Sequence, residues 1–192
     1  MVGNKLDMNI NDVEKVLNEK YRDYVRTVRH ISWDEDNEVY MSTDEIHKMY
    51  SYDEIIKSCL SGPDTLQSVD GISIQGGCIN FIEFKNGKFE RKNLLGKISE
   101  GKHYLQEVLL ERTYFSVEGI KTRFVLVYNK EKLIRNNPSL DKLMECVAEK
   151  GNIPVNRWKF GRSLTHTWHF FDEAVSLGET EFQERIDEYV GK

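Results

Sequence analysis

Two apolar alternations separated by a pair of glycines constrain the fold more than any other part of this sequence. The segment SVDGISIQ (residues 68–75) leads into Gly76 and Gly77, and CINFIEFK (residues 78–85) follows them. Strand-like alternation on both sides of a Gly-Gly pair is typical of a β-hairpin with a two-residue turn, because glycine adopts positive φ at little cost. We therefore expect a hairpin over residues 68–85.

The register of this hairpin brings two carboxylates together. It pairs Gln75 with Cys78, Ile74 with Ile79, and Ile72 with Phe81. Asp70 then lies directly opposite Glu83 on the same face, with the two β-carbons roughly 5 Å apart. Opposed like charges are destabilising, and Lys85 projects from that same face. The predicted arrangement therefore calls for a cation between the two acids.

Asp70, Glu83 and Lys85, in the order acid, then Glu-Phe-Lys, resemble the active site of the PD-(D/E)xK nuclease superfamily. The resemblance implies that Asp70 and Glu83 hold Mg²⁺ or Mn²⁺, with the Phe84 carbonyl as a backbone ligand. It also implies that Lys85 orients or activates the attacking water. The resemblance covers only the core of the chain, and E-x-K strands are common. The alternative is an exposed Glu83–Lys85 pair with no functional role.

A literal Pro-Asp pair, Pro63-Asp64, competes with Asp70 for the role of first acid. It lies in the segment SGPD, a cluster of turn-forming residues. We expect a turn there and assign the first acid to Asp70.

The order of expected elements matches the core of that superfamily. Hydrophobic spacing predicts a helix from Asn11 or Asp12 onward, with apolar positions running to Val28. Then come two short helices opened by S-x-x-E capping boxes, the hairpin, a third strand, a longer helix and a buried strand. The boxes pair Ser42 with Glu45 and Ser51 with Glu54, and the later elements span Lys88–Lys92, Leu94–Leu109 and Thr122–Tyr128. This predicts an α/β (α+β) fold with a restriction-endonuclease-like αβββαβ core, a mixed central sheet flanked by helices.

One departure from the family pattern follows from this order. The family's acids lie on the second and third strands, whereas here Asp70 and Glu83 fall on the first and second. Either an earlier strand such as Glu38–Met41 joins the sheet, or Lys88–Lys92 is a loop.

Further candidates flank the three site residues. The resemblance implies an additional acid from the helix before the sheet, and Glu54 is the candidate, although its capping box with Ser51 is a competing role. Glu45 is a weaker candidate for the same reason. On the helix after the sheet, Lys97 is expected to meet the scissile phosphate, with an ordinary surface lysine as the alternative.

The charge distribution favours a nucleic-acid partner around the site although the chain carries a net charge of −5. Basic residues outnumber acidic ones after the hairpin, and the candidates for nucleic-acid binding are Lys88, Arg91, Lys92, Lys97 and Lys102. A second basic stretch runs from Lys130 to Arg162, while acids gather at Asp34–Glu38 and after Asp172. We expect a basic site that binds the phosphate backbone, with DNA favoured over RNA. The alternative for each basic run is a solvated face.

A chain of 192 residues fits one domain. Within it we expect an N-terminal helical extension (1–50), a catalytic core (51–130) and a C-terminal elaboration (131–192). The absence of a long apolar run predicts no membrane span and a cytoplasmic protein. The cysteines lack metal-site spacing and are expected to be reduced core residues: Cys59, Cys78 and Cys146.

The sequence thus predicts a Mg²⁺- or Mn²⁺-dependent hydrolase that cleaves phosphodiester bonds, with a homodimer as one form suited to cutting both strands. The alternative is a catalytically inactive, nuclease-like binding or assembly module in a defence or mobile-element system. His166 and His169 fall in a strand-like segment that places them on opposite faces, so we assign them to packing or surface.

Overall fold

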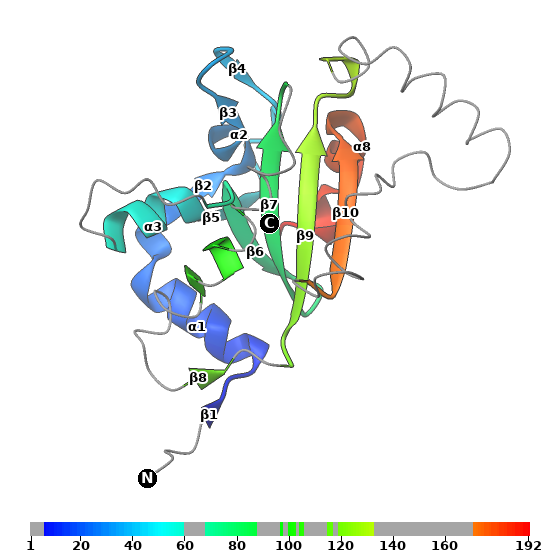
Figure 1. Ribbon diagram of the computed structural model, residues 1–192. Helices are drawn as coiled ribbons and strands as arrows, with labels where there is room; N and C mark the ends of the chain where they lie inside the picture. Colours follow the sequence, from blue (N-terminus) through cyan, green and yellow to red (C-terminus); the bar gives the residue numbers. More distant parts are fainter. Residues whose placement is uncertain are drawn as a thin grey trace, which may run out of the picture.

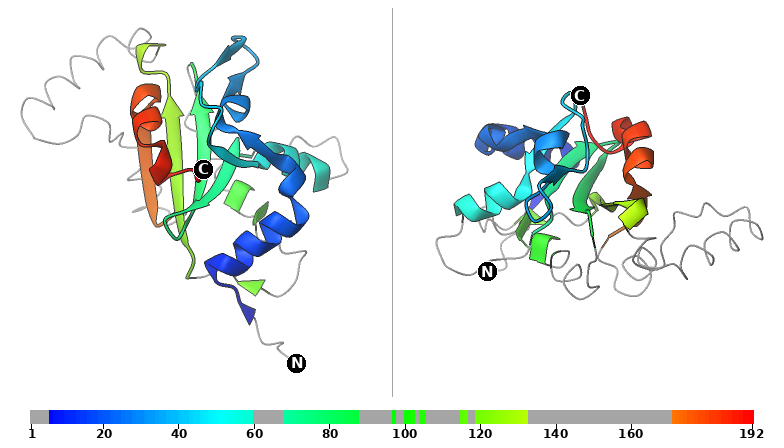
Figure 2. Two further views of the ribbon diagram at one scale, coloured as in Figure 1. Left: turned by 180° about the vertical axis from the view of Figure 1, so that it is seen from behind. Right: turned by 90° about the horizontal axis from the view of Figure 1, so that it is seen from above.

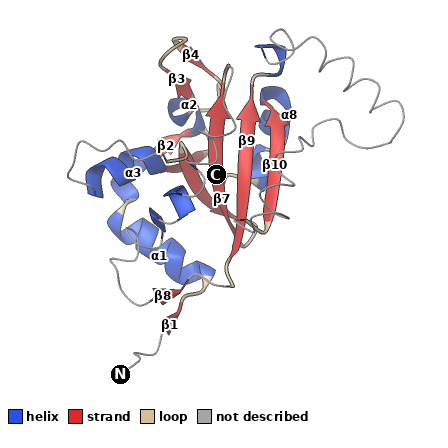
Figure 3. Ribbon diagram, in the orientation of Figure 1, coloured by secondary structure: helices blue, strands red, loops and turns tan. Residues whose placement is uncertain are grey.

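The computed structural model describes residues 6–59, 68–87, 97, 100–102, 104–105, 115–116, 119–132 and 171–192. These residues form a mixed α/β structure built around a six-stranded sheet with helices on both faces (Figures 1 and 3). The mixed class is as predicted, and the finer restriction-endonuclease-like core remains an expectation at this level.

The central sheet has the strand order β10-β9-β7-β6-β5-β2. Its strands are β2 (Val25–Thr27), β5 (Lys48–Ser51), β6 (Gly71–Gln75), β7 (Cys78–Lys85), β9 (Lys121–Tyr128) and β10 (Glu173–Gly178). Strands β2, β5, β6 and β7 run antiparallel to their neighbours, whereas β9 is parallel to β7 and β10 is parallel to β9. Two small sheets lie outside it, formed by β1 (Leu6–Asp7) with β8 (Phe115–Ser116) and by β3 (Trp33–Asp34) with β4 (Val39–Tyr40).

The β6–β7 hairpin has the predicted register. Gly76 and Gly77 have φ values of 63° and 68°, the left-handed region that a type I′ turn requires and that glycine adopts without strain. Cross-strand partners are Gln75 with Cys78, Ile74 with Ile79, and Ile72 with Phe81. The hairpin was therefore readable from its turn chemistry and alternation alone.

Two apolar cores sandwich the sheet, one on each face (Figure 2). On one face, α1 (Ile10–Lys20) and α3 (Tyr52–Cys59) cover side chains such as Phe81 and Phe124. On the other, α8 (Glu179–Glu184) and the 3-10 turn η3 (Ile186–Glu188) cover side chains such as Val125. Each fully buried large side chain contributes roughly 1.5–3 kcal/mol, so both layers hold the sheet in place.

Helix α1 begins where its cap dictates and ends earlier than its apolar spacing predicted. The Asn9 side chain accepts from the N–H groups of Asn11 and Asp12, and the Asp12 carboxylate accepts from the Asn9 N–H, which completes a capping box. After Tyr21 the chain forms a 3-10 turn, η1 (Arg22–Tyr24), then strand β2, then the short helix α2 (Val28–Ile31). Pairing of β2 with β5 overrides the helical period, so the expected N-terminal helical extension also supplies sheet strands.

The two predicted capping boxes had different outcomes. The box at Ser51 is followed by helix α3 as expected, but the helix predicted at Ser42 is wrong, since residues 41–47 are neither helix nor strand. In that segment the Asp44 carboxylate instead accepts from the backbone N–H groups of Ile46 and His47, which makes a local turn.

An earlier strand does join the central sheet before the hairpin, and it is β5. Residues Val39–Tyr40 do form a strand, but they pair with β3 rather than with the central sheet. Strand β5 pairs with β6 instead, with helix α3 between them in the chain, so Asp70 directly precedes the second and Glu83 lies on the third of the antiparallel strands β5, β6 and β7. The expected third strand at Lys88–Lys92 lies outside the described residues. None of the described helices has the length and apolar character needed to cross a bilayer.

Candidate functional site

Asp70 and Glu83 are brought together by the hairpin, as the sequence predicted. Gly71 pairs with Ile82, so Asp70, one residue before β6, faces Glu83 in β7. The Asp70 carboxylate turns across the strands, where its Oδ2 accepts the Phe84 N–H at 2.7 Å. A backbone hydrogen bond therefore fixes the orientation of the first acid.

The Glu83 carboxylate is fully buried and has 0 % exposed surface. Its Oε1 is 2.6 Å from the Lys85 Nζ and 3.0 Å from the Lys97 Nζ. Its Oε2 has no hydrogen-bond donor among the described residues. A buried carboxylate oxygen without a partner is costly, so this atom is the feature of the cluster that packing does not explain.

Lys97 bridges the two acids. Its Nζ is 3.7 Å from the Asp70 Oδ1 as well as 3.0 Å from Glu83. Residues 100–102 and 104–105 have helical backbone in the same stretch of chain, where the Gly101 carbonyl accepts the Tyr52 hydroxyl at 2.6 Å and Leu105 is buried. These contacts hold this helical stretch against the sheet and place Lys97 over the acids.

Burial and like charge decide the protonation of this cluster. Burial first, and the neighbouring Glu83 charge second, raise the pKa of Asp70 to about 7, although Lys97, Lys85 and the Phe84 N–H act against the rise. Burial lowers the pKa of Lys97, but the charges of Glu83 and Asp70 outweigh it, and the net pKa lies above its ordinary value. The ammonium of Lys97 therefore stays charged, while Asp70 titrates near neutral pH.

The oxygen ligands present fit a hard divalent cation. Mg²⁺ is commonly held by one or two carboxylates together with waters and substrate phosphate oxygens. Asp70 and the unpartnered Glu83 oxygen can provide the carboxylate ligands. The described residues contain no cluster of three or more histidine, cysteine or carboxylate side chains suited to a metal, so water and substrate would complete the coordination. The Phe84 carbonyl as a ligand stays a prediction.

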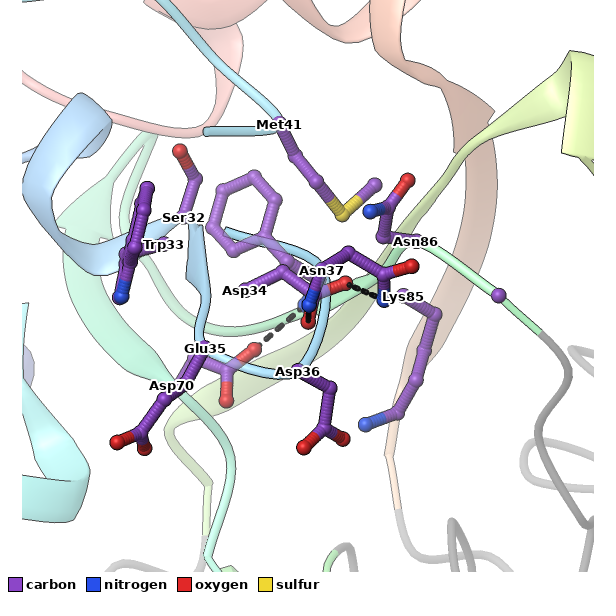
Figure 4. Close-up of a pocket in the computed structure, with 12 residues that line it drawn as sticks. Ser32, Trp33, Asp34, Glu35, Asp36, Asn37, Met41, Asp70, Lys85 and Asn86 are labelled. Atoms are coloured by element: carbon purple, nitrogen blue, oxygen red, sulfur yellow. Dashed lines mark hydrogen bonds between the residues drawn. The ribbon is translucent and has the colours of Figure 1, made fainter. Parts of the chain in front are cut away.

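An acidic loop borders the site, a neighbour that the expected basic surroundings did not include. A pocket of about 350 Å³ is lined by Asp70 and Lys85 together with Asp34, Glu35 and Asp36 (Figure 4). These three acids lie in the β3–β4 hairpin, far from Asp70 in the sequence. Local patterns could predict a turn at this loop but not the surface on which it would lie. This was the part of the site that the sequence did not reveal.

The auxiliary candidates separate clearly. Glu54 does not join the two acids, because its Oε2 is 2.7 Å from the Arg26 Nη2 and its Oε1 is 3.7 Å from the His30 Nε2. Glu45 pairs with Arg29. Only Lys97 reaches the site.

Lys102 contacts the opposite end of the same face. Its Nζ lies 3.5 Å from the Thr122 hydroxyl and 5.4 Å from the centre of the Phe171 ring, at the start of β9 rather than beside Asp70. Cys59 and Cys78 are free thiols; the expected core position holds for Cys78, which is buried, and is wrong for Cys59, which is exposed. Several other candidates lie outside the described residues: Asp64, Lys88, Arg91, Lys92, Cys146, His166 and His169.

Comparison with protein-family models, with curated proteins and with solved structures found no match for this chain.

Proposed function

We propose that this protein is a metal-dependent nuclease that hydrolyses phosphodiester bonds, with DNA as the favoured substrate. One observation carries the proposal: Asp70 and Glu83 face each other across the β6–β7 hairpin, and the Lys85 ammonium contacts the Glu83 Oε1. Two acids and a lysine on one face of neighbouring strands match the residue types and order of the PD-(D/E)xK site.

The strand arrangement supports the same proposal. Strands β5, β6 and β7 pair antiparallel, a helical stretch follows, and β9 then lies parallel to β7. These pairings agree with an αβββαβ core, but helix α3 lies between β5 and β6, so the order of elements departs from it there. The agreement concerns topology and site together, which is more specific than an E-x-K strand alone.

The chain's own residues have distinct roles in the proposed reaction. Asp70 and Glu83 would hold Mg²⁺ or Mn²⁺, which supplies charge stabilisation at the phosphate and a bound water of lowered pKa. Lys85, one strand period beyond Glu83, would hold the attacking water and offset charge that develops in the transition state. Lys97, which also contacts Glu83, would bind the scissile phosphate once its ammonium group leaves the carboxylates.

The test is cleavage of supercoiled plasmid, single-stranded DNA and single-stranded RNA with Mg²⁺ or Mn²⁺. We expect wild-type protein to cut at least one substrate and Glu83→Gln to cut none, because the amide keeps the shape but loses the charge. The matched control is Glu45→Gln, an acid paired with Arg29 away from the cluster, which should retain activity. Activity retained in Glu83→Gln would remove the second acid from the mechanism.

The contact between Lys97 and both acids favours a second candidate function, an inactive nuclease-like binding or assembly module in a defence or mobile-element system. In that case the lysine neutralises the acids permanently, and no divalent ion enters. Metal titration separates the two. Mn²⁺ binding that is lost in Glu83→Gln favours the nuclease, and no binding to either protein favours the module.

A further inference from the structure

A basic pocket lies at the edge of the central sheet formed by β2, the last strand in the sheet order. It has a volume of about 650 Å³ and shares no lining residue with the acidic pocket beside Asp70. Its polar lining comes from α1, η1, β2, α2 and β5 and consists of Asn18, Arg22, Arg26, Thr27, His30 and Lys48. Short elements that are separate in the chain therefore bring three permanent cations and one histidine together in this pocket.

The arginine at the centre of the pocket is preorganised. The Arg26 Nη1 donates to the carbonyls of Asp23 at 2.7 Å and Val25 at 3.1 Å, and its Nη2 donates to Glu54 at 2.7 Å. A guanidinium has five N–H groups, so its remaining donors stay available in a fixed orientation. Fixing a donor before binding reduces the entropy lost when a ligand arrives.

Two other cations have no charge partner among the residues that the structure describes. Arg22 and Lys48 are exposed, and neither side chain forms an ion pair within the described part of the chain. The one carboxylate in ion-pair contact with the pocket is Glu54, which is already bound to Arg26 and close to His30. In a chain of net charge −5, this excess of positive charge is local rather than an average property.

The pocket adjoins the candidate site through one short segment. His30 lines the basic pocket, whereas Ser32 and Trp33 line the acidic pocket that contains Asp70. The Trp33 ring is 43 % exposed and lies 4.6 Å from the Tyr40 ring. An exposed aromatic ring between a basic groove and a reaction site is an arrangement on which a base can stack.

We propose that the pocket of Arg22, Arg26, His30 and Lys48 binds the phosphodiester backbone of a nucleic-acid strand and anchors it beside the Asp70–Glu83 site. The inference rests on the proposed function for the identity of the strand as substrate. Phosphates bind the unpaired Arg22 and Lys48 and the remaining N–H groups of Arg26. Trp33 lies where the strand passes towards Asp70. Anchoring here overcomes the repulsion that the acidic loop exerts on phosphate near the site.

The test measures binding of fluorescein-labelled single-stranded DNA by anisotropy, in EDTA so that no cleavage occurs, over a series of salt concentrations. The test variant is Arg22→Gln with Lys48→Gln, which leaves Arg26 and its structural contacts intact. The control, Lys57→Gln with Lys121→Gln, removes the same charge from exposed lysines outside the pocket. Thermal unfolding of all three proteins checks that each is folded.

We expect the test variant to bind about tenfold more weakly near 0.1 M salt, and its salt slope to fall by about 1.4 from the loss of two phosphate contacts. The control should bind as wild type does. Equal weakening in both variants, or no change in either, would overturn the pocket as a backbone site. Calorimetry with inorganic phosphate distinguishes a small phosphate ligand from a nucleic-acid backbone. If the test variant alone loses the heat of inorganic-phosphate binding while its DNA binding is unchanged, the pocket binds a small phosphate ligand and its role as a backbone site is overturned.

The outcomes distinguish this inference from the proposed function. Wild-type protein that cleaves DNA while the test variant binds DNA normally refutes the pocket and leaves the nuclease intact. Wild-type protein that binds DNA through the pocket but cleaves nothing with Mg²⁺ or Mn²⁺ refutes the nuclease and retains the pocket. No binding of DNA by wild-type protein refutes the pocket.

Discussion

Two ionic clusters in this molecule look alike in composition and differ in how completely their atoms are satisfied. In one, His47 lies between two carboxylates, with its Nδ1 2.9 Å from the Asp44 Oδ2 and its Nε2 2.7 Å from the Asp187 Oδ1. In the other, two lysines converge on Glu83, and the remaining Glu83 oxygen has no partner among the described residues.

The His47 cluster is closed. The Asp44 Oδ1 accepts two backbone N–H groups, and its Oδ2 accepts from Gln183 as well as from His47. Burial lowers the pKa of His47, but hydrogen bonds and charge from Asp187 and Asp44 outweigh it, so the pKa is raised. The cluster fastens residues near the C-terminus to the loop before β5, and both ring nitrogens of His47 and both carboxylate oxygens of Asp44 have partners.

The Glu83 cluster is open. Burial first and the Glu83 charge second raise the pKa of Asp70, and the buried Glu83 Oε2 has no hydrogen-bond partner among the described residues. Perturbed carboxyl groups of this kind gather at functional sites, whereas closed ion pairs serve packing. The difference between the clusters is therefore the physical basis for assigning chemistry to one and structure to the other.

The largest effect expected from this contrast is the loss of cleavage in Lys85→Met. A positioned proton-transfer group typically contributes 10²- to 10⁴-fold, so we expect the rate of DNA cleavage to fall about 10³-fold. Thermal stability and Mn²⁺ binding should change little, because Lys97 still pairs with Glu83. Wild-type cleavage in this variant would remove the lysine from the mechanism.

The next largest effect is on stability, at the closed cluster. In His47→Ala the buried Asp44 carboxylate loses its imidazole partner, and we expect the free energy of unfolding to fall by about 3 kcal/mol in urea titration. Asp187→Asn is the matched variant. Because Asp187 is largely exposed, that change should cost much less than His47→Ala does. Similar losses from both changes would show that the cluster is not buried in solution.

A smaller effect is expected where the open cluster meets its lysine. Lys97 contacts the same carboxylates that a divalent ion would bind, so Lys97→Met should tighten Mn²⁺ binding about tenfold, or about 1.4 kcal/mol, by calorimetry. Lys57→Met, on the far exposed side of α3, is the control and should leave the affinity unchanged. Weaker binding in Lys97→Met would mean that the lysine organises the acids for the metal rather than competing with it.

The smallest effect is a pH dependence of stability at Asp70. Since the pKa of Asp70 is raised to about 7 from an ordinary 3.8, the folded state holds this proton more tightly than the unfolded state does. The resulting stabilisation is present below pH 4 and is lost as the pH rises to about 7. Asp70→Asn should therefore be more stable than wild type by about 1 kcal/mol at pH 8, in metal-free buffer, and equal to it near pH 4.

This comparison has a built-in control, since His47 titrates in the same way in both proteins and cancels in the difference. Its own contribution to stability is present below about pH 6.5 and declines as the pH rises through its raised folded-state value. If Asp70→Asn is less stable than wild type at pH 8, the charge of Asp70 contributes more to holding Lys97 than its burial costs.

Local patterns predicted the hairpin and the facing acids well, because each depends on neighbours in the chain. The turn glycines, the alternation of apolar residues and the register from Gln75 to Asp70 are all encoded within a few residues of one another. The same holds for the strand at Thr122–Tyr128, which is part of β9. Such features need no knowledge of the rest of the fold.

Local patterns failed where distant segments compete. Val25 continues a helical period in the sequence, but it lies in the edge strand β2, because β5 is available to pair with that strand. Glu54 satisfied a capping pattern and was a candidate for the site, yet Arg26 from β2 binds it. In each case a partner far along the chain offered a stronger interaction than the local one.

The sequence by itself determined which residues face one another across the hairpin, and therefore that Asp70, Glu83 and Lys85 share one sheet face. Only the tertiary structure decided what surrounds them: Lys97 over the acids, the Asp34–Asp36 loop along the pocket wall, and a basic pocket at the β2 edge. The reason is physical, since register follows from bonded geometry with a period of two. The position of a loop or helix over a sheet follows from packing between residues that the sequence keeps far apart.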